Sequence, residues 1–371
     1  MKKISSLFAV LTLSLMFFSC GQTSEPKKNS FDIKNGINVG GWLSQSKKIG
    51  EDRKAHFTRS DVEYIANLGY DHIRIPIDEE QMFDENGLKN MEAFALLHSA
   101  LGWCDEFNLR TVVDLHILRS HHFADTERPL FTDTNAQEQF FECWRKISEE
   151  LSKYSVDKVA YEPLNEPVAN DHENWNKVLN RCVEVIRELE PERTVVIGSN
   201  EWSHWDTMKF LRVPENDPNI IISFHYYKPQ LFTHYGSWLY SDDPITVPVH
   251  YPGQTIADTD LDAAKDYAMQ GKMIYNIEVI ESNLMEVIEF AQKYNLKLYC
   301  GEYGCMNTVA EEDRIQWIKD VNTLFVQHGI ARANWNYDRG GMGIFLHTGK
   351  PDTKLINAIF GKKQVNLLQS Y

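Results

Sequence analysis

The strongest constraint on the fold of this chain is a repeated alternation between short apolar runs and longer segments with helical periodicity. The apolar runs are nearly continuous in hydrophobic residues, which is typical of parallel strands buried on both faces. A (β/α)8 TIM barrel of the α/β class is the simplest fold that accommodates all of them. A doubly wound open sheet is the alternative, but its Gly-rich dinucleotide fingerprint is absent. Strands are predicted at 37–39, 70–76, 110–116, 158–164, 194–198, 219–226, 296–302 and 331–336.

One connection in this pattern is much longer than the others. Residues 228–282 separate the sixth predicted strand from a helix expected to begin at Asn283, whereas βα loops usually have about 2–6 residues. This segment is rich in aromatic side chains, and it is predicted to be an inserted subdomain that walls one side of a cleft. No linker follows residue 30, so residues 31–371 are predicted to form one domain.

The start of the chain has the pattern of an export signal. Two lysines precede an apolar stretch, Leu7 to Phe18, that is too short to span a bilayer. Cys20 follows a small residue just after that stretch, as in a lipoprotein signal that is cut before the cysteine. We therefore predict a lipoprotein-type signal peptide at 1–19, lipid attachment at Cys20 and a tether at 20–30. An ordinary cleaved signal peptide is the alternative.

This reading predicts an exported protein that is lipid-anchored to a bacterial membrane, on its periplasmic or its cell-surface side. The formal net charge of −15 disfavours binding to nucleic acid and to anionic membrane surfaces. Membrane contact is thus expected only through the N-terminal lipid, and a monomer is expected. The remaining cysteines lack CxxC spacing, so neither a zinc site nor a disulfide framework is predicted, although a bond between Cys300 and Cys305 stays open.

Polar and aromatic side chains collect at the carboxyl ends of the predicted strands, where (β/α)8 barrels place their active sites. Two of them are glutamates, in Asn165-Glu166-Pro167 after the fourth strand and Gly301-Glu302-Tyr303-Gly304 at the end of the seventh. Two carboxyl groups that face each other across a cleft are the chemical requirement of a glycosidase. The other candidates for substrate binding are Arg74, His116, Asn165, His225, Tyr227 and Trp335.

A retaining glycosidase needs one ionised carboxylate and one protonated carboxyl group. Glu302 is predicted to be the nucleophile, because Arg74 and the Tyr227 hydroxyl can stabilise its charge. Glu166 is predicted to be the acid and then the base. Partial burial and repulsion from Glu302 are expected to keep Glu166 protonated near neutral pH, and His225 is expected to adjust the pKa of Glu166.

The other candidates are expected to contact the sugar. Asn165 is expected to donate a hydrogen bond to the 2-hydroxyl, and Trp335 to lie under the ring of the sugar that is cleaved. Glu162 is the competing carboxylate: it shares the face of its strand with Glu166, one layer deeper, and is expected to pair with Arg74 and His116.

A metal-dependent hydrolase is a further alternative, because several histidines follow the third strand. The cluster consists of His116, His121 and His122 together with Asp114. Histidines spaced within one strand and its loop are unremarkable, so no metal and no cofactor are predicted.

The ordered set of motifs resembles glycoside hydrolase family 5, the cellulase family of (β/α)8 barrels, from about residue 36 to residue 360. Within that family the chain is similar to compact bacterial endoglucanases of the endoglucanase C type. The resemblance rests on Gly36–Trp42, Ile73–Pro76, Asp114–His116, Asn165–Pro167, His225–Tyr227, Gly301–Gly304 and Trp335–Asn336, and the subgroup on Gly40–Gln45, Tyr251–Gln254 and Lys297–Glu302.

This resemblance implies retaining, endo-acting hydrolysis of β-1,4-glucosidic bonds in cellulose-like or mixed-linkage β-glucans, without a cofactor. It assigns Glu166 as acid/base and Glu302 as nucleophile. Two departures lie near the expected sugar sites: Ile117 stands where many relatives have a second histidine, and the segment Asp338–Gly343 differs. Exo-β-glucosidase or β-mannanase action on a polysaccharide or oligosaccharide therefore stays open, as does a non-catalytic surface glycan-binding lipoprotein.

Overall fold

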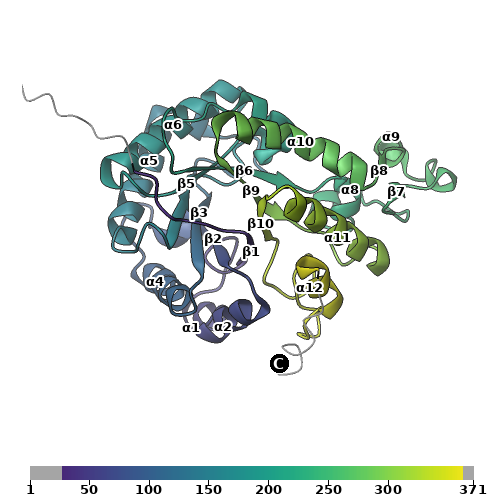
Figure 1. Ribbon diagram of the computed structural model, residues 1–371, viewed down its shortest axis with the longest axis horizontal. Coiled ribbons are helices and arrows are strands. Elements are labelled where there is room, and N and C mark those ends of the chain that lie inside the picture. Colours follow the sequence, from purple (N-terminus) through teal and green to yellow (C-terminus); the bar gives the residue numbers. More distant parts are fainter. Residues whose placement is uncertain (1–26, 362–371) are drawn as a thin grey trace, which may run out of the picture.

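The computed structural model describes residues 27–361, and within them eight parallel strands close into a barrel (Figure 1). The (β/α)8 prediction is confirmed. Each strand pairs with its neighbours in the order β1-β2-β3-β4-β5-β6-β9-β10, and β10 returns to β1. The strands are β1 (Asn35–Asn38), β2 (His72–Asp78), β3 (Arg110–Ile117), β4 (Val159–Glu162), β5 (Val195–Gly198), β6 (Ile220–Tyr226), β9 (Lys297–Tyr303) and β10 (Ala331–Asn334).

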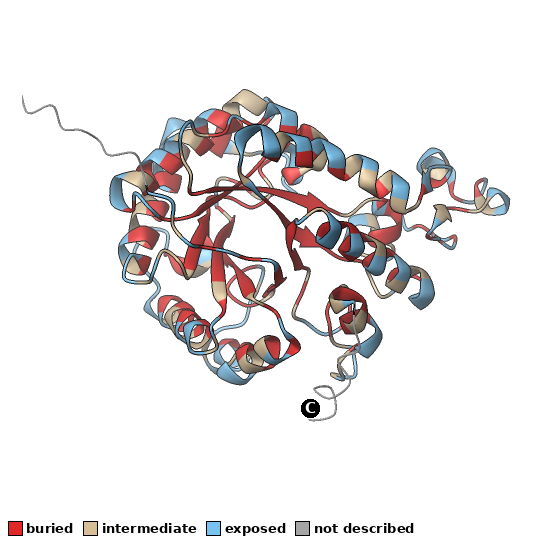
Figure 2. Cartoon of the chain, viewed as in Figure 1, coloured by how far each residue is buried: buried red, intermediate tan, exposed pale blue. Residues whose placement is uncertain are grey.

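Helices surround the barrel and bury one face each against the strands (Figure 2). In α6, for example, Trp175, Leu179, Cys182 and Ile186 are buried at helical spacing, and the Asp171 carboxylate caps the helix by accepting from the Glu173 N–H. A 3-10 helix, Trp205–Phe210, follows β5. The helices are α1 (Gly50–Lys54), α2 (Arg59–Leu68), α3 (Glu79–Met82), α4 (Met91–Glu106), α5 (Thr134–Leu151), α6 (His172–Leu189), α7 (Asn200–Ser203), α8 (Gln230–Thr233), α9 (Ala268–Gly271), α10 (Ile277–Tyr294), α11 (Glu311–Gln327) and α12 (Thr353–Phe360).

The segment between β6 and α10 is the inserted subdomain, and it projects beyond the barrel (Figure 1). It contains α8, α9 and a small antiparallel sheet of β7 (Gly253–Gln254) and β8 (Ile274–Tyr275). The Tyr251 hydroxyl donates to Asp320 on α11 over 2.7 Å, which ties the subdomain to the barrel. The expected start of the next helix at Asn283 is wrong. The helix begins at Ile277 because the Asn276 side chain caps it, so the insertion ends before residue 282.

The amino end of the barrel is closed by the first residues that the structure describes. Phe31 and Ile33 are 3% and 4% exposed. The Asn29 side chain hydrogen-bonds to Thr194 over 2.9 Å, and its backbone N–H donates to Asn219. This seal leaves the carboxyl ends of the strands as the open face. Phe31 and Ile33 pack with the barrel interior, formed by Val112, Ala160, Val196, Ile221, Tyr299, Ala331 and Ala333.

The predicted signal peptide at 1–19, the lipid site at Cys20 and the first part of the tether at 20–30 lie outside the described residues. No helix within residues 27–361 is long and apolar enough to cross a membrane. Cys300 and Cys305 are both free thiols, so the possible bond between them is not formed.

We predict that Phe31→Ala lowers the free energy of unfolding by about 3 kcal/mol, because it empties the apolar seal of the barrel. Denaturant unfolding of the purified protein measures this change. Leu88→Ala is the control, since Leu88 is 66% exposed and its truncation is expected to change stability by less than about 0.5 kcal/mol. Equal effects of the two substitutions would show that the N-terminal segment does not stabilise the barrel.

Candidate active site

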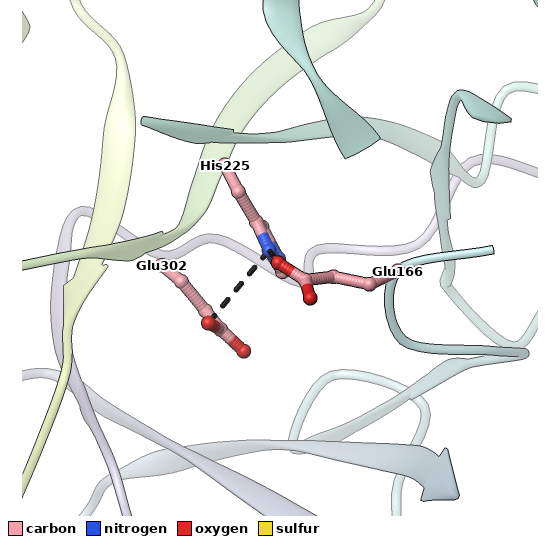
Figure 3. Close-up of side chains that lie close together, drawn as sticks. All are labelled: Glu166, His225 and Glu302. Atoms are coloured by element: carbon pink, nitrogen blue, oxygen red, sulfur yellow. Dashed lines mark hydrogen bonds and ion pairs between the residues drawn. The ribbon is translucent and has the colours of Figure 1, made fainter. Parts of the chain in front are cut away.

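The two glutamates meet at the carboxyl end of the barrel, with His225 between them (Figure 3). Glu302 lies in β9 and His225 in β6, while Glu166 follows β4. The Nδ1 atom of His225 lies 2.8 Å from Oε1 of Glu166 and 3.7 Å from Oε2 of Glu302. One oxygen of Glu166 and one of Glu302 are within 4.8 Å of each other. The structure therefore brings together two carboxyl groups that are far apart in the sequence.

Arg74 is the charged centre beneath this pair, and it is fully buried in β2. Its guanidinium donates to both oxygens of Glu162, over 2.7 and 2.9 Å, and to Oε1 of Glu302 over 2.8 Å. It also lies 3.0 Å from Asp114. The expected pairing of Arg74 with Glu162 is confirmed. Because Arg74 occupies both oxygens of Glu162, that carboxylate supports the site from below and does not face the cleft.

Glu302 is held by two donors, one on each carboxylate oxygen. Arg74 donates to Oε1, and the Tyr227 hydroxyl donates to Oε2 over 2.9 Å. Glu302 is 5% exposed, so these contacts replace the water that an exposed carboxylate would bind. The contacts expected from Arg74 and Tyr227 are both present.

Glu166 has a different environment. Its backbone adopts φ = 43°, in the left-handed region that is unfavourable for residues other than glycine. Burial raises the pKa of its carboxyl group to about 8, and nearby Glu162 adds to this effect while Arg74 opposes it. The expected contribution of burial therefore holds, but the like charge that adds to it is Glu162 and not Glu302. The carboxyl group of Glu166 is mostly protonated at neutral pH.

The two histidines are neutral at neutral pH. Burial lowers the pKa of His225 to about 4, although the negative charge of Glu302 opposes this. Burial also lowers the pKa of His116 to about 4, again against the effect of Glu302. The expected pairing of His116 with Glu162 is wrong: its Nδ1 lies 2.6 Å from Oδ2 of Asp114, because the two residues share one face of β3.

Asn165 is oriented by the groups beneath it. Its side-chain oxygen accepts from Arg74 over 2.8 Å, and its NH2 group lies 3.3 Å from Nε2 of His116. Since Arg74 has no acceptor, the amide oxygen must face it and the NH2 group must face the other way. Nε2 of His116 then accepts, and its Nδ1–H donates to Asp114. This fixed orientation leaves one N–H of Asn165 free to donate elsewhere.

Trp335 follows β10 and is partly exposed. Its ring stacks on His116, with centroids 5.7 Å apart and planes inclined by 14°. A Cβ atom at Gly40 would lie 3.1 Å from the Trp335 ring and 2.9 Å from the Asn336 amide, so a glycine is required beside the indole. Both contacts restrict where the ring can lie.

Three ligand-type side chains within residues 27–361 converge closely enough to bind a metal ion, namely Glu166, His225 and Glu302. A histidine with two carboxylates is a ligand set that divalent transition metals accept. However, Arg74 already donates to Glu302, so a second cation would be repelled at this position. The histidines after β3 do not converge: His116 contacts Asp114, while His121 accepts from the Val168 N–H over 3.2 Å.

Sequence reasoning missed the roles of two polar residues inside the barrel. The side-chain oxygen of Asn38 accepts from Arg74 over 3.0 Å, and its NH2 group donates to the Gly301 carbonyl over 3.0 Å. Asp114 bridges Arg74 and His116, and burial raises its pKa to about 7. The available signal was a polar side chain in a strand that is otherwise apolar, which must find a partner when buried.

Comparison with known proteins agrees with this geometry. Residues 34–341 match the family described as cellulase (glycosyl hydrolase family 5). Endoglucanase C of Acetivibrio thermocellus is 33% identical over 341 residues, which cover 89% of this chain and 99% of that protein. Cellodextrinase A of Ruminococcus flavefaciens is 31% identical over 304 residues, which cover 81% of this chain and 84% of that protein.

Solved structures share the same barrel. The cellulose synthase subunit Z of Clostridioides difficile superposes with a TM-score of 0.72 at 25% identity, over 88% of this chain and 99% of that one. A hyperthermophilic endo-β-1,4-glucanase superposes with a TM-score of 0.73 at 24% identity, over 89% of this chain and 97% of that one. With the family matched across residues 34–341, and a relative 33% identical along nearly its whole length, this chain belongs to glycoside hydrolase family 5, the cellulase family, and is a glycoside hydrolase.

Proposed function

We propose that the protein is a retaining, endo-acting β-glucanase that hydrolyses β-1,4-glucosidic bonds in cellulose-like or mixed-linkage β-glucans. The observation that carries this proposal is the approach of Glu166 and Glu302 to within 4.8 Å between oxygens. Retaining glycosidases hold their two carboxyl groups about 5–5.5 Å apart, whereas inverting enzymes need about 6.5–9.5 Å to admit a water molecule. The relatives named endoglucanase C and cellodextrinase A support a β-glucan as the substrate class.

In the first step, a carboxylate oxygen of Glu302 attacks the anomeric carbon and forms a glycosyl ester. The bond to the leaving sugar breaks, and Glu166 gives its proton to the leaving oxygen. The raised pKa of Glu166, about 8, favours this role because the acid enters the reaction protonated near neutral pH.

In the second step, Glu166 takes a proton from water as the water attacks the anomeric carbon, and the Glu302 carboxylate is released. Esterification removes the negative charge of Glu302 beside Arg74. The positive charge of Arg74 is then less compensated, and it favours the ionised form of Glu166 that the second step requires. The same residue can therefore act first as an acid and then as a base.

The remaining residues are proposed to bind the sugar. Asn165 presents a free N–H that can donate to the 2-hydroxyl, a contact that strengthens in the transition state. Trp335 offers a partly exposed ring, which packs on His116, as a stacking surface for the sugar that is cleaved. This chemistry needs no cofactor, no nucleic acid and no second copy of the chain.

We also propose that the protein is exported and anchored by lipid on Cys20. The polar segment after Cys20 and the apolar stretch before it support this proposal. The described chain begins at the amino end of the barrel, where the Asn219 side chain donates to the carbonyl of Lys27. A tether attached there would leave the carboxylates facing away from the membrane.

The first prediction concerns the products formed from cellopentaose. The wild-type protein is expected to cleave internal bonds and release cellobiose and cellotriose, which product chromatography resolves. Glu302→Gln keeps the shape of the side chain without a nucleophile, so turnover is expected to fall at least about 10⁴-fold while binding of the oligosaccharide persists. Normal turnover by Glu302→Gln would exclude Glu302 as the nucleophile.

The same assay separates the alternatives. Release of glucose alone would indicate an exo-acting glucosidase, and cleavage of mannan alone would indicate a β-mannanase. Binding of glycans without cleavage of either substrate would indicate a binding lipoprotein.

The second prediction concerns stability and pH in Glu166→Gln. The pKa of Glu166 is raised in the folded state from 4.5 to about 8. Between these values the folded protein holds a proton that the unfolded chain has lost, so this residue lowers stability as pH rises. Glutamine removes that dependence. The variant should gain stability over wild type by up to about 1.4 kcal/mol per pH unit in this window.

Urea unfolding at several pH values between 5 and about 8 measures this difference. Glu85→Gln is the matched control, because Glu85 is exposed and its substitution should shift stability by the same small amount at every pH. Parallel stability curves for wild type and Glu166→Gln would mean that Glu166 is not buried as a neutral group.

A further inference from the structure

Glu166 lies in a segment that belongs to no helix or strand. The strand β4 ends at Glu162 and the helix α6 begins at His172. Glu302, in contrast, lies within β9 and is supported by the strands on either side. The direction of the Glu166 carboxyl group therefore depends on whatever holds the backbone just after it.

Each of the three residues after Glu166 is held by a different side chain or backbone group from a neighbouring loop. The Trp202 N–H donates to the carbonyl of Pro167 over 3.2 Å. The N–H of Val168 donates to Nε2 of His121 over 3.2 Å. We call residues 167–169 the acid turn, since Glu166 precedes them.

Asn200 makes the closest contacts with the acid turn. Its side-chain oxygen accepts from the N–H of Ala169 over 2.7 Å, and its NH2 group donates to the carbonyl of Ala169 over 2.8 Å. The backbone N–H and the backbone carbonyl of Ala169 are thus both hydrogen-bonded to the side chain of Asn200. Asn200 is 3% exposed and His121 is 1% exposed, so water does not compete for these bonds.

The backbone that follows Asn200 has an unusual conformation. Glu201, Trp202 and Ser203 have φ values of 58°, 60° and 52°, so three successive residues with side chains adopt the left-handed conformation. This conformation is unfavourable for residues that carry a Cβ atom. A Cβ atom at Gly198 would lie 2.5 Å from Oγ of Ser203, so the turn also requires a glycine. Strain of this kind persists at functional sites where surrounding contacts maintain it.

We infer that Asn200 and His121 are positioning residues for Glu166, which act by holding the acid turn so that the carboxyl group points at the leaving oxygen. This inference rests on the proposed role of Glu166 as acid/base. Their hydrogen bonds go to the backbone of Val168 and Ala169 within the acid turn. His121 suits the role because burial lowers its pKa to about 3, so Nε2 remains an acceptor across the working range.

Proton transfer requires a hydrogen-bond distance between the acid and the leaving oxygen, and a displacement of about 1 Å can cost about 100-fold in rate. Loosening the acid turn should therefore weaken only those steps in which Glu166 gives or takes a proton. Steps that need no proton should be spared, and this difference separates positioning from general damage.

The test compares two substrates in the purified full chain. Cellopentaose has a sugar leaving group that must be protonated, whereas 2,4-dinitrophenyl β-cellobioside has a leaving group that departs as an anion. For Asn200→Ala we expect kcat/KM to fall about 10- to 100-fold on cellopentaose and less than about 3-fold on the dinitrophenyl substrate. Equal losses on both substrates, or no loss on either, would overturn the inference.

A second measurement, the rescue of kcat by azide, tests the role of Glu166 as a base. With the dinitrophenyl substrate, kcat of Asn200→Ala should be restored by azide, which attacks the glycosyl ester without giving up a proton. The products are then the β-glycosyl azide and the free Glu302 carboxylate. His121→Ala should show the same pattern, and His121→Gln, which keeps an acceptor, should restore part of the rate on cellopentaose. Absence of rescue by azide in both alanine variants would contradict a positioning role.

Two controls complete the design. The side chain of Asn180 donates to the carbonyls of Asn176 and Arg212 over 2.9 and 3.1 Å, outside the site. Asn180→Ala thus loses similar bonds, and it should lower Tm without changing the ratio of the two kcat/KM values. Asn200→Ser, which keeps one hydrogen-bonding oxygen, provides the same comparison if Asn200→Ala does not fold.

Glu166→Gln serves as the benchmark that separates the two proposals. If it retains full activity on cellopentaose, the proposed acid/base role fails. If it loses cellopentaose activity selectively and Asn200→Ala does not, the proposed function stands and the positioning inference is wrong.

Discussion

The structure depends on one buried guanidinium. Arg74 contacts Glu162, Asp114 and Glu302, and it also donates to Asn38 and Asn165. These partners come from four different strands or the loops that follow them, namely β1, β3, β4 and β9. A single cation therefore links the interior of the barrel to the carboxyl group proposed to attack the sugar. A buried charge of this kind is costly unless all of its donors are used. Loss of Arg74 would leave Glu162 and Glu302 buried without their cationic partner. The need to use all of the Arg74 donors accounts for the polar side chains in strands that are otherwise apolar.

The position of Arg74 also distinguishes the two glutamates, because it donates a hydrogen bond to Glu302. Burial raises the pKa of Glu166 to about 8 and that of Asp114 to about 7, while it lowers those of His116 and His225 to about 4. Glu302 instead receives the guanidinium and a tyrosine hydroxyl. Two carboxyl groups of the same residue type thus have different surroundings, since Glu302 accepts from two donors while burial raises the pKa of Glu166. This difference is the physical basis of the proposed double displacement.

The two glutamates also differ in how their backbones are held. Glu302 lies within a strand, where ladder hydrogen bonds determine its position. Glu166 lies beyond the end of β4, where its place depends on His121 and Asn200 from the loops after the neighbouring strands. In the proposed mechanism Glu166 must reach two different oxygen atoms, because it first protonates the leaving oxygen and then takes a proton from the attacking water. A turn fixed by several separate contacts gives it a defined position without making it part of a rigid strand.

The sequence by itself determined the (β/α)8 barrel, the insertion after the sixth strand and the residues that gather at the strand ends, because periodicity and strand polarity are local properties. The contacts of Arg74 with Glu162 and Glu302 were also expected from the sequence, but only the tertiary structure decided several other partners. His116 pairs with Asp114 and not with Glu162, and Glu162 rather than Glu302 adds to the raised pKa of Glu166. The roles inferred for Asn200 and His121 were also invisible, although both residues could be read as polar positions near strand ends. The pair of His116 and Asp114 lies within one strand, but the other contacts depend on the register between strands and on closure of the barrel, which join residues far apart in the chain and leave no local pattern.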